Sequence, residues 1–98
     1  MENKEFGSTC PLIDKRKLIN EKIIEESQIT ALGLLKYKNK EFIIIGFYGG
    51  KIEVYDSLNL EKVAYDKNID CTCVRDIGQL IDNYFAAACL ENISIYIL

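Results

Sequence analysis

Apolar residues along this chain follow two patterns that are both typical of β-strands. Phe42 to Tyr48 is a continuous apolar run of strand length, as expected for a central strand buried on both faces. Ile52 and Val54 alternate with Lys51 and Glu53, which is the period of two of a half-buried strand. Further strands are predicted at Ile29 to Leu35, Glu61 to Tyr65, Cys71 to Ile77, Tyr84 to Leu90 and Ile93 to Leu98.

Polar or glycine-rich segments separate the predicted strands. Gly49-Gly50 is a hairpin signal, because consecutive glycines accept the positive φ of a tight turn. Turns are also predicted at Lys38-Asn39-Lys40 and Ser57-Leu58-Asn59, and Asp66-Lys67-Asn68 is predicted as a polar link.

The predicted strands belong to a repeat of about 40 to 45 residues, the length of one four-stranded propeller blade. Five motifs recur in the same order and with nearly constant spacing: Glu21-Lys22-Ile23-Ile24 with Glu61-Lys62-Val63-Ala64, Ile13-Asp14 with Tyr55-Asp56, Thr30-Ala31-Leu32 with Thr72-Cys73-Val74, Phe42 with Phe85, and Ile52-Glu53-Val54-Tyr55 with Ile93-Ser94-Ile95-Tyr96. The repeat favours a strand at Leu18 to Glu25. The alternative there is a helix over Asp14 to Glu26, which is rich in Lys and Glu.

The expected fold class is all-β, with antiparallel four-stranded propeller-type blades. About two and a half blades are expected, in an incomplete ring. Residues 1–11 are expected to form a flexible N-terminus and 12–28 the end of one blade. A complete blade is expected at 29–66 and a partial blade at 69–98. Because a propeller has about 4–8 blades, this chain alone would leave apolar sheet faces and strand edges exposed.

The segment from Gly46 to Asp56 resembles the hairpin of the WD40-repeat β-propeller family. It matches that hairpin without a gap: the family's residue types stand at Gly46, Gly50, Ile52 and Asp56, while Val54 replaces Leu and Tyr55 replaces Trp. The resemblance implies that Ile52 and Val54 point into a core between blades. The chain has no histidine, so the family's Gly-His dipeptide and its buried Asp–His network are missing. Asp14 and Asp56 are therefore expected at solvent-facing turns.

Phe85 to Leu98 carries a second, finer similarity, which Gly49 to Tyr55 also suits. Both segments look like strand pairs of the triple-propeller proteins. That group includes a large splicing-factor subunit, a polyadenylation-factor subunit and the damaged-DNA-binding adaptor.

No set of residues predicts catalysis, and the chain is expected not to be an enzyme. Without histidine there is no Ser-His or Cys-His nucleophile, and Gly49-Gly50 does not fit a phosphate-binding loop. Cys10, Cys71, Cys73 and Cys89 could be combined into a four-thiolate zinc site. Structural zinc usually needs Cys-x-x-Cys motifs, which are missing, so burial as small apolar residues is favoured. No cofactor and no metal are expected.

Charge and cysteine content narrow the expected partners and location. The 98 residues carry 12 basic and 15 acidic side chains, and basic residues cluster only at Lys15-Arg16-Lys17. Direct nucleic-acid binding is therefore not expected. The N-terminus does not resemble a signal peptide, and no apolar run has the length of a membrane span. The four cysteines are expected as reduced thiols in a cytoplasmic or nuclear protein.

The expected function is that of a protein–protein interaction scaffold or adaptor segment with WD40-like repeats. Its partners would be other proteins or the remaining blades of a longer propeller, with no membrane involved. The candidate protein contact is the turn at Phe47, Tyr48, Gly49 and Gly50, because aromatic residues are enriched at binding surfaces. The alternative is a small self-assembling structural β-protein that completes a propeller ring by oligomerisation.

Overall fold

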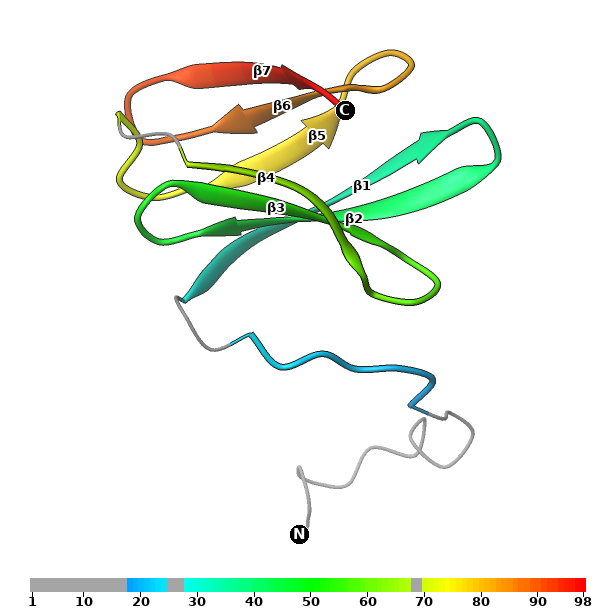
Figure 1. Cartoon of the computed structure of the whole chain (residues 1–98). Helices are drawn as coiled ribbons and strands as arrows, with labels where there is room; N and C mark the ends of the chain where they lie inside the picture. The colour runs from blue at the N-terminus through cyan, green and yellow to red at the C-terminus, as the bar shows by residue number, and fades with distance from the viewer. Residues whose placement is uncertain (1–17, 25–27, 68–69) are drawn as a thin grey trace, which may run out of the picture.

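The protein consists of two antiparallel β-sheets, one stacked on the other (Figure 1). The computed structural model describes residues 18–24, 28–67 and 70–98, and within these ranges there are seven strands and no helix. The predicted all-β fold class is confirmed. The two sheets do not close into a ring, which is consistent with an incomplete propeller-like arrangement.

The first sheet has the strand order β1-β2-β3-β4, with each strand beside its neighbour in the sequence. Its strands are β1 (Ile29–Tyr37), β2 (Lys40–Phe47), β3 (Lys51–Asp56) and β4 (Lys62–Lys67). Lys38 and Asn39 join β1 to β2 with φ values of 51° and 64°, in the positive range that a two-residue hairpin turn requires. Gly49 and Gly50, with φ of 99° and 91°, form the predicted turn between β2 and β3.

The second sheet has three strands in the order β5-β6-β7: β5 (Asp76–Gln79), β6 (Tyr84–Ala88) and β7 (Ile93–Ile97). β5 begins later than the predicted strand at Cys71 to Ile77, because the residues before it bond to the first sheet instead. The Gly49 amide donates to the Thr72 carbonyl at 2.7 Å, and the Val74 amide donates to the Phe47 carbonyl at 3.3 Å. Residues 71–75 therefore form a loop that connects the two sheets.

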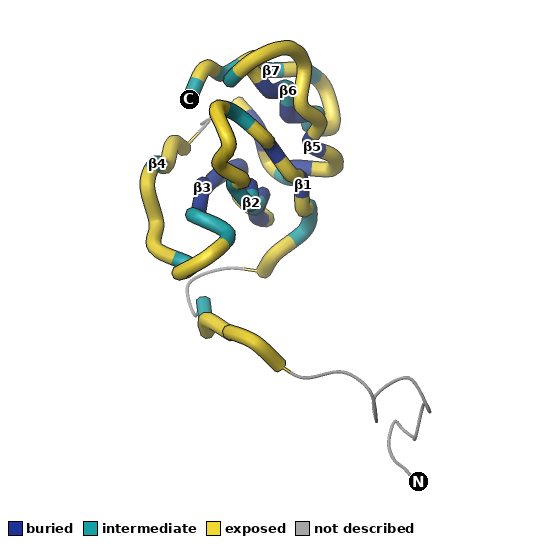
Figure 2. Tube along the Cα trace, turned by 90° about the vertical axis from the view of Figure 1, so that its right-hand side faces the viewer, coloured by how far each residue is buried: buried dark blue, intermediate teal, exposed yellow. Residues whose placement is uncertain are grey.

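The hydrophobic core lies between the two sheets, where the dark blue segments of both meet (Figure 2). Its buried residues are Leu35, Ile44, Ile52, Val54, Cys71, Val74, Ile77, Phe85 and Ala87. Ile52 and Val54 therefore occupy the core as the sequence indicates. The sheets approach closely at β1 and β5, and on the β3–β4 and β6–β7 side a cavity of about 240 Å³ lies between them.

The segment before β1 differs from its prediction. Residues 18–24 belong to no strand or helix, so the predicted strand at Leu18 to Glu25 and its helical alternative are both wrong for these residues. A strand needs a neighbour that shares its backbone hydrogen bonds, and residues 18–24 enter no such ladder. The expected flexible N-terminus, Asp14 and Cys10 lie outside the described residues.

Candidate protein-binding faces

The predicted contact at the β2–β3 turn is only partly on the surface. Phe47 and Gly50 are buried, whereas Tyr48 and Gly49 are exposed. The expectation that Phe47 is exposed is therefore wrong. The reason is that the turn packs against the 71–75 loop through the hydrogen bonds described above, and the Lys51 ammonium lies 5.4 Å from the centroid of the Phe47 ring. The four residues do not form one continuous contact surface.

Two larger surfaces lie on the outer sides of the two sheets. Cross-strand partners in an antiparallel sheet share a face, so the strand registers show which residues point outward. On the first sheet, the side away from the second sheet carries Leu32, Leu34, Ile43, Ile45, Glu53 and Tyr55, which we call the leading face. On the second sheet, the side away from the first carries Asp76, Gly78, Tyr84, Ala86, Ala88, Ile93, Ile95 and Ile97, which we call the trailing face.

The leading face has an apolar half and a charged half. Over the middle of β1 and β2 it is apolar, and Leu32 and Leu34 are each 64% exposed, while the Lys36–Glu41 ion pair lies near the β1–β2 turn. Over β3 it holds Glu53, which is only 3% exposed. The Tyr55 hydroxyl donates to Oε1 of Glu53, and the ammonium groups of Lys62 and Lys51 lie 3.2 Å and 3.4 Å from its Oε2.

The neighbours of Glu53 favour its charged form. Burial acts to raise the pKa of the Glu53 carboxyl, but hydrogen bonds from Tyr55, Lys62 and Lys51 outweigh it and hold the pKa below its usual value. The 18–24 segment lies over this charged half, because the Lys22 ammonium is 5.0 Å from the centroid of the Tyr55 ring and donates to the Leu60 carbonyl at 3.2 Å. The apolar half remains exposed.

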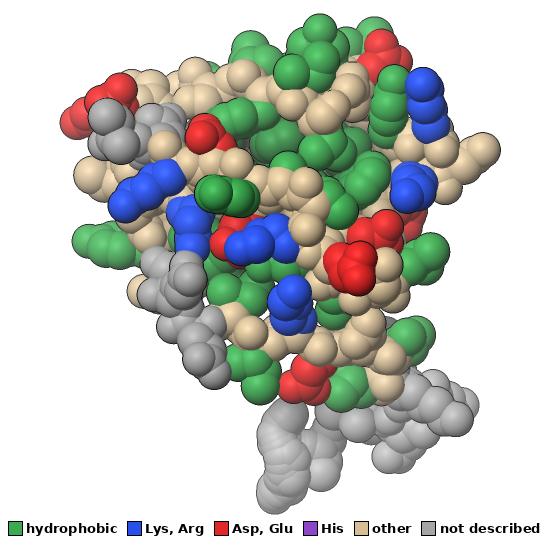
Figure 3. Space-filling view, in the orientation of Figure 1, with side chains coloured by type: hydrophobic (Ala, Val, Ile, Leu, Met, Phe, Trp, Pro, Cys, Tyr) green, Lys and Arg blue, Asp and Glu red, His purple; other side chains and the backbone are tan. Residues whose placement is uncertain are grey.

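The trailing face is apolar except at one end, where the exposed Asp76 lies beside Ala88. Ile93, Ile95 and Ile97 alternate with Ser94 and Tyr96 along β7, and these isoleucines are 72%, 65% and 62% exposed. Hydrophobic side chains also gather along the upper margin of the molecule, where β7 lies (Figure 3). Burying one such side chain contributes about 1.5–3 kcal/mol, so a face of this kind favours a covered state.

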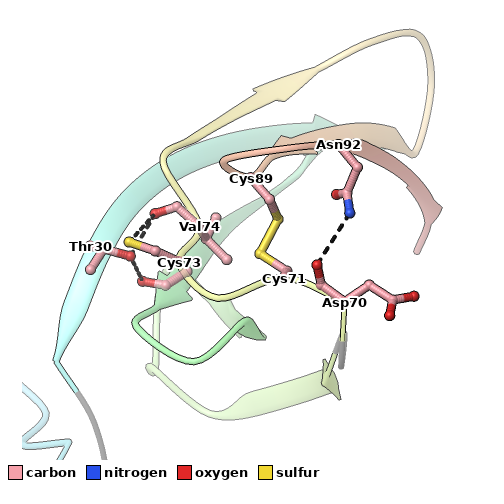
Figure 4. The surroundings of a disulfide bond; sticks show 8 residues. Thr30, Asp70, Cys71, Cys73, Val74, Cys89 and Asn92 are labelled. Carbon is pink, nitrogen blue, oxygen red and sulfur yellow. Dashed lines mark hydrogen bonds between the residues drawn. A yellow bond between two sulfur atoms is a disulfide. The ribbon is translucent and has the colours of Figure 1, made fainter.

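A disulfide fixes the loop between the sheets to the second sheet. Cys71 and Cys89 are joined, with Cα atoms 5.6 Å apart, so the expectation of reduced thiols is wrong for this pair (Figure 4). Cys73 is a free, half-buried thiol whose sulfur lies 3.9 Å from the Val74 carbonyl oxygen. Thr30 anchors the same loop to β1, because its hydroxyl donates to the Val74 carbonyl at 2.6 Å.

The described residues offer little that could support other chemistry. Across residues 18–24, 28–67 and 70–98, no three His, Cys, Asp or Glu side chains lie close enough together to hold a metal ion. Asp56, expected at a solvent-facing turn, is instead the last residue of β3; its side chain is only 16% exposed and accepts a hydrogen bond from the Leu58 amide at 2.8 Å. In the same part of the chain, no helix is long and apolar enough to cross a membrane.

Sequence reasoning anticipated exposed sheet faces but did not select their residues. The signal for β7 was present, since Ile93, Ile95 and Ile97 alternate with smaller or polar residues. The exposure of Leu32 and Leu34 could not be predicted, because Ile29 to Leu35 has apolar residues at both odd and even positions and its pattern does not show which side faces solvent.

Comparison with known proteins bears on the fold. No family model matches this chain, and no curated protein matches it. Among solved structures, it is similar to the crystal structure of the computationally designed Ika4 protein, with a TM-score of 0.65 and 20% sequence identity. The match covers 84% of this chain and 48% of that one, so this chain spans about half the length of the designed protein. At this identity the likeness shows a shared fold and nothing more.

Proposed function

We propose that the chain is a scaffold segment that binds other protein β-sheets through its leading and trailing faces. The observation that carries the proposal is the presence of exposed apolar side chains on two opposite sheet faces, Leu32 and Leu34 on one and Ile93, Ile95 and Ile97 on the other. Contiguous apolar surface of this kind marks interaction sites in soluble proteins.

The packing of the chain itself supports sheets as the partners. The inner sides of the two sheets, which face each other, already bury each other within this chain through residues such as Ile44 and Phe85. Sheet-on-sheet packing is the ordinary way in which a flat apolar sheet face is covered. The resemblance of the β2–β3 hairpin to the WD40 family adds that the missing neighbours are further propeller-type blades, which can come from the same polypeptide or from another one.

We assign no catalytic role to the chain. Glu53, the most buried charged group described, is fully engaged by Tyr55, Lys51 and Lys62 and has a stabilising role. Direct binding to nucleic acid or membrane is not part of the proposal. A cytoplasmic or nuclear location is not part of it either, because that expectation rested on reduced cysteines and Cys71 and Cys89 form a disulfide.

The test is the size of the native assembly that contains the chain. A tagged chain in its natural host is expected to elute from a sizing column well above 11.2 kDa, its monomer mass. Leu32→Lys and Ile95→Lys, one on each face, are expected to shift it toward smaller species. Leu58→Lys is the matched control, since Leu58 is 87% exposed in the β3–β4 turn and lies on neither face. An unchanged profile in both face variants would contradict the proposal.

A further inference from the structure

The strand registers make the two sheets equivalent position by position when the last pair of the β2–β3 ladder, Gly46 and Ile52, is matched with that of the β6–β7 ladder, Ala88 and Ile93. In the first sheet Gly33 lies beside Ile44, which lies beside Val54. In the second sheet Gly78 lies beside Ala86, which lies beside Ile95. Gly33 and Gly78 are therefore equivalent residues on the same side of their sheets. By the same registers, Leu32 of β1 is equivalent to Ile77 of β5.

Gly33 is a glycine because the second sheet packs directly on it. A Cβ atom at this position would lie 2.6 Å from Cγ2 and 2.8 Å from Cβ of Ile77, closer than real side chains approach one another. The contact between the sheets inside this chain therefore has a specific form: an isoleucine of one sheet occupies a notch made by a glycine of the other.

Gly78 forms the same notch on the trailing face, but nothing fills it. A Cβ atom at Gly78 would meet nothing within 4 Å. Its backbone does not require glycine either, because only Gly49 and Gly50 among the described glycines have a positive φ. Since glycine weakens a strand, its presence here calls for a close neighbour on the open side.

The chain also carries the residue that fits this notch. Leu32, the equivalent of Ile77, projects from the leading face and is 64% exposed. We propose that the leading face of a second copy of this chain packs on the trailing face, with Leu32 of that copy seated on Gly78. This inference rests on the proposed function and names the partner.

The sizes of the neighbouring residues suit the same arrangement. Inside the chain, small Ala87 of the second sheet and large Ile44 of the first share the core. Their equivalents on the open faces are large Ile45 on the leading face and small Ala86 on the trailing face. Each contact thus combines one isoleucine with one alanine, although the isoleucine stands on the inner side of the first sheet in one contact and on its outer side in the other. The summed side-chain volume is therefore the same in both contacts, as close packing requires.

Such contacts join copies head to tail, because the two faces in contact are different. Head-to-tail contacts generate rings when the rotation closes. A propeller of about 4–8 blades built from two sheets per copy would need two to four copies.

Light scattering on the purified full chain tests the proposal. The wild type is expected at two to four times 11.2 kDa. Gly78→Val fills the notch of the trailing face and Leu32→Lys charges the leading face, so each variant alone is expected to be a monomer. A mixture of the two is expected to form one-to-one dimers, since the intact Leu32 of the first variant can dock on the intact Gly78 of the second.

Controls keep the outcomes distinct. Circular dichroism must show the wild-type β-rich spectrum for both variants, and Ala86→Glu replaces Gly78→Val if that variant does not fold. A monomeric or polydisperse wild type, an oligomer that survives both variants, or a mixture that stays monomeric each overturns the second-copy proposal. If the assembly in the host still depends on both faces while the purified chain is a monomer, the scaffold function stands and its partner is another protein.

Discussion

The two sheets have the same antiparallel order of successive strands, but the residues on their outer sides differ. On the first sheet, Glu53 and Tyr55 of β3 form a buried polar group with two lysines, and the 18–24 segment covers Tyr55. On the second, the equivalents Ser94 and Tyr96 point inward, and Tyr96 stacks on Phe85 with ring centroids 5.2 Å apart. Burial and the nearby Asp66 carboxylate raise the pKa of Tyr96.

The two outer sides therefore differ in how far this chain itself covers them and pairs their polar groups. The β3 half of the leading face satisfies its own polar groups and is partly covered by the chain itself. The trailing face places three isoleucines in solvent, has its charged residue, Asp76, at one end beside Ala88, and is not covered by another segment among the described residues. The trailing face is therefore the side on which the proposed scaffold function places the next sheet.

The largest expected effect contrasts the two equivalent glycines. Gly33→Val should lower the free energy of unfolding by about 3 kcal/mol, because its side chain would overlap Ile77 and force the sheets apart. Gly78→Val should leave the isolated chain as stable or raise its stability by about 0.5–1 kcal/mol, because the strand loses a glycine and the space is open. Urea unfolding followed by circular dichroism, on a dilute sample, measures both. Equal losses of unfolding free energy in the two variants would mean that Gly33 and Gly78 are equally crowded.

The next expected effect on stability comes from the disulfide that joins the 71–75 loop to the second sheet. The Cys71–Cys89 disulfide closes a loop with a sequence separation of 18, and loops of this size stabilise a fold by about 3 kcal/mol. The double variant Cys71→Ala with Cys89→Ala should therefore lose about that much. Cys73→Ala, at the free half-buried thiol in the same loop, is the matched control and should lose clearly less. A wild type whose urea midpoint does not change on adding a reductant would refute this role.

A smaller effect comes from the charged half of the leading face. Glu53→Gln keeps the shape of the side chain but weakens hydrogen bonds to a charged acceptor, which should cost about 2 kcal/mol at neutral pH. Because the pKa of Glu53 is lowered on folding, its contribution is present above the ordinary carboxyl pKa. That contribution is lost as the pH falls through the lower folded value.

The pH dependence supplies the measurement for Glu53. From about pH 5 downward, the free energy of unfolding of the wild type should fall more steeply than that of Glu53→Gln. Tyr55→Phe, which removes one donor and keeps the carboxylate, should give an intermediate slope. Parallel pH profiles for all three proteins would show that Glu53 is not stabilised as a carboxylate.

Much of the fold could be predicted from local sequence. The Gly49-Gly50 turn, the alternation of Ile52 and Val54 and the repeat of the β3 pattern in β7 all depend on residues close in the chain, and the all-β fold class follows from them. The start of β5 could not be predicted, because Thr72 and Val74 bond to a turn more than twenty residues earlier. The burial of Phe47 has the same origin: which side of a continuous apolar run is covered depends on elements distant in the sequence.

The candidate faces depended even more on tertiary contacts. The repeat alignment paired Phe42 with Phe85, whereas the strand registers make Phe42 equivalent to Tyr84. A shift of one residue moves a side chain to the opposite face of a sheet, so a sequence repeat alone does not define a face. The role of Gly78 became visible only when its environment could be compared with that of Gly33.

The smallest expected effect tests the segment that covers the leading face. The Lys22 ammonium contacts the Tyr55 ring and the Leu60 carbonyl, an exposed pair of interactions worth about 0.5 kcal/mol. Lys22→Met keeps the aliphatic stem and removes the charge, so the segment should leave the sheet more often and chymotrypsin should cleave after Leu18 about twofold faster. Lys38→Met is the matched control, since its ammonium lies 5.3 Å from the Tyr37 ring in the β1–β2 turn, away from the 18–24 segment. If both variants are cleaved at the wild-type rate, Lys22 does not hold the segment on the sheet, and the charged half of the leading face is as open as the apolar half.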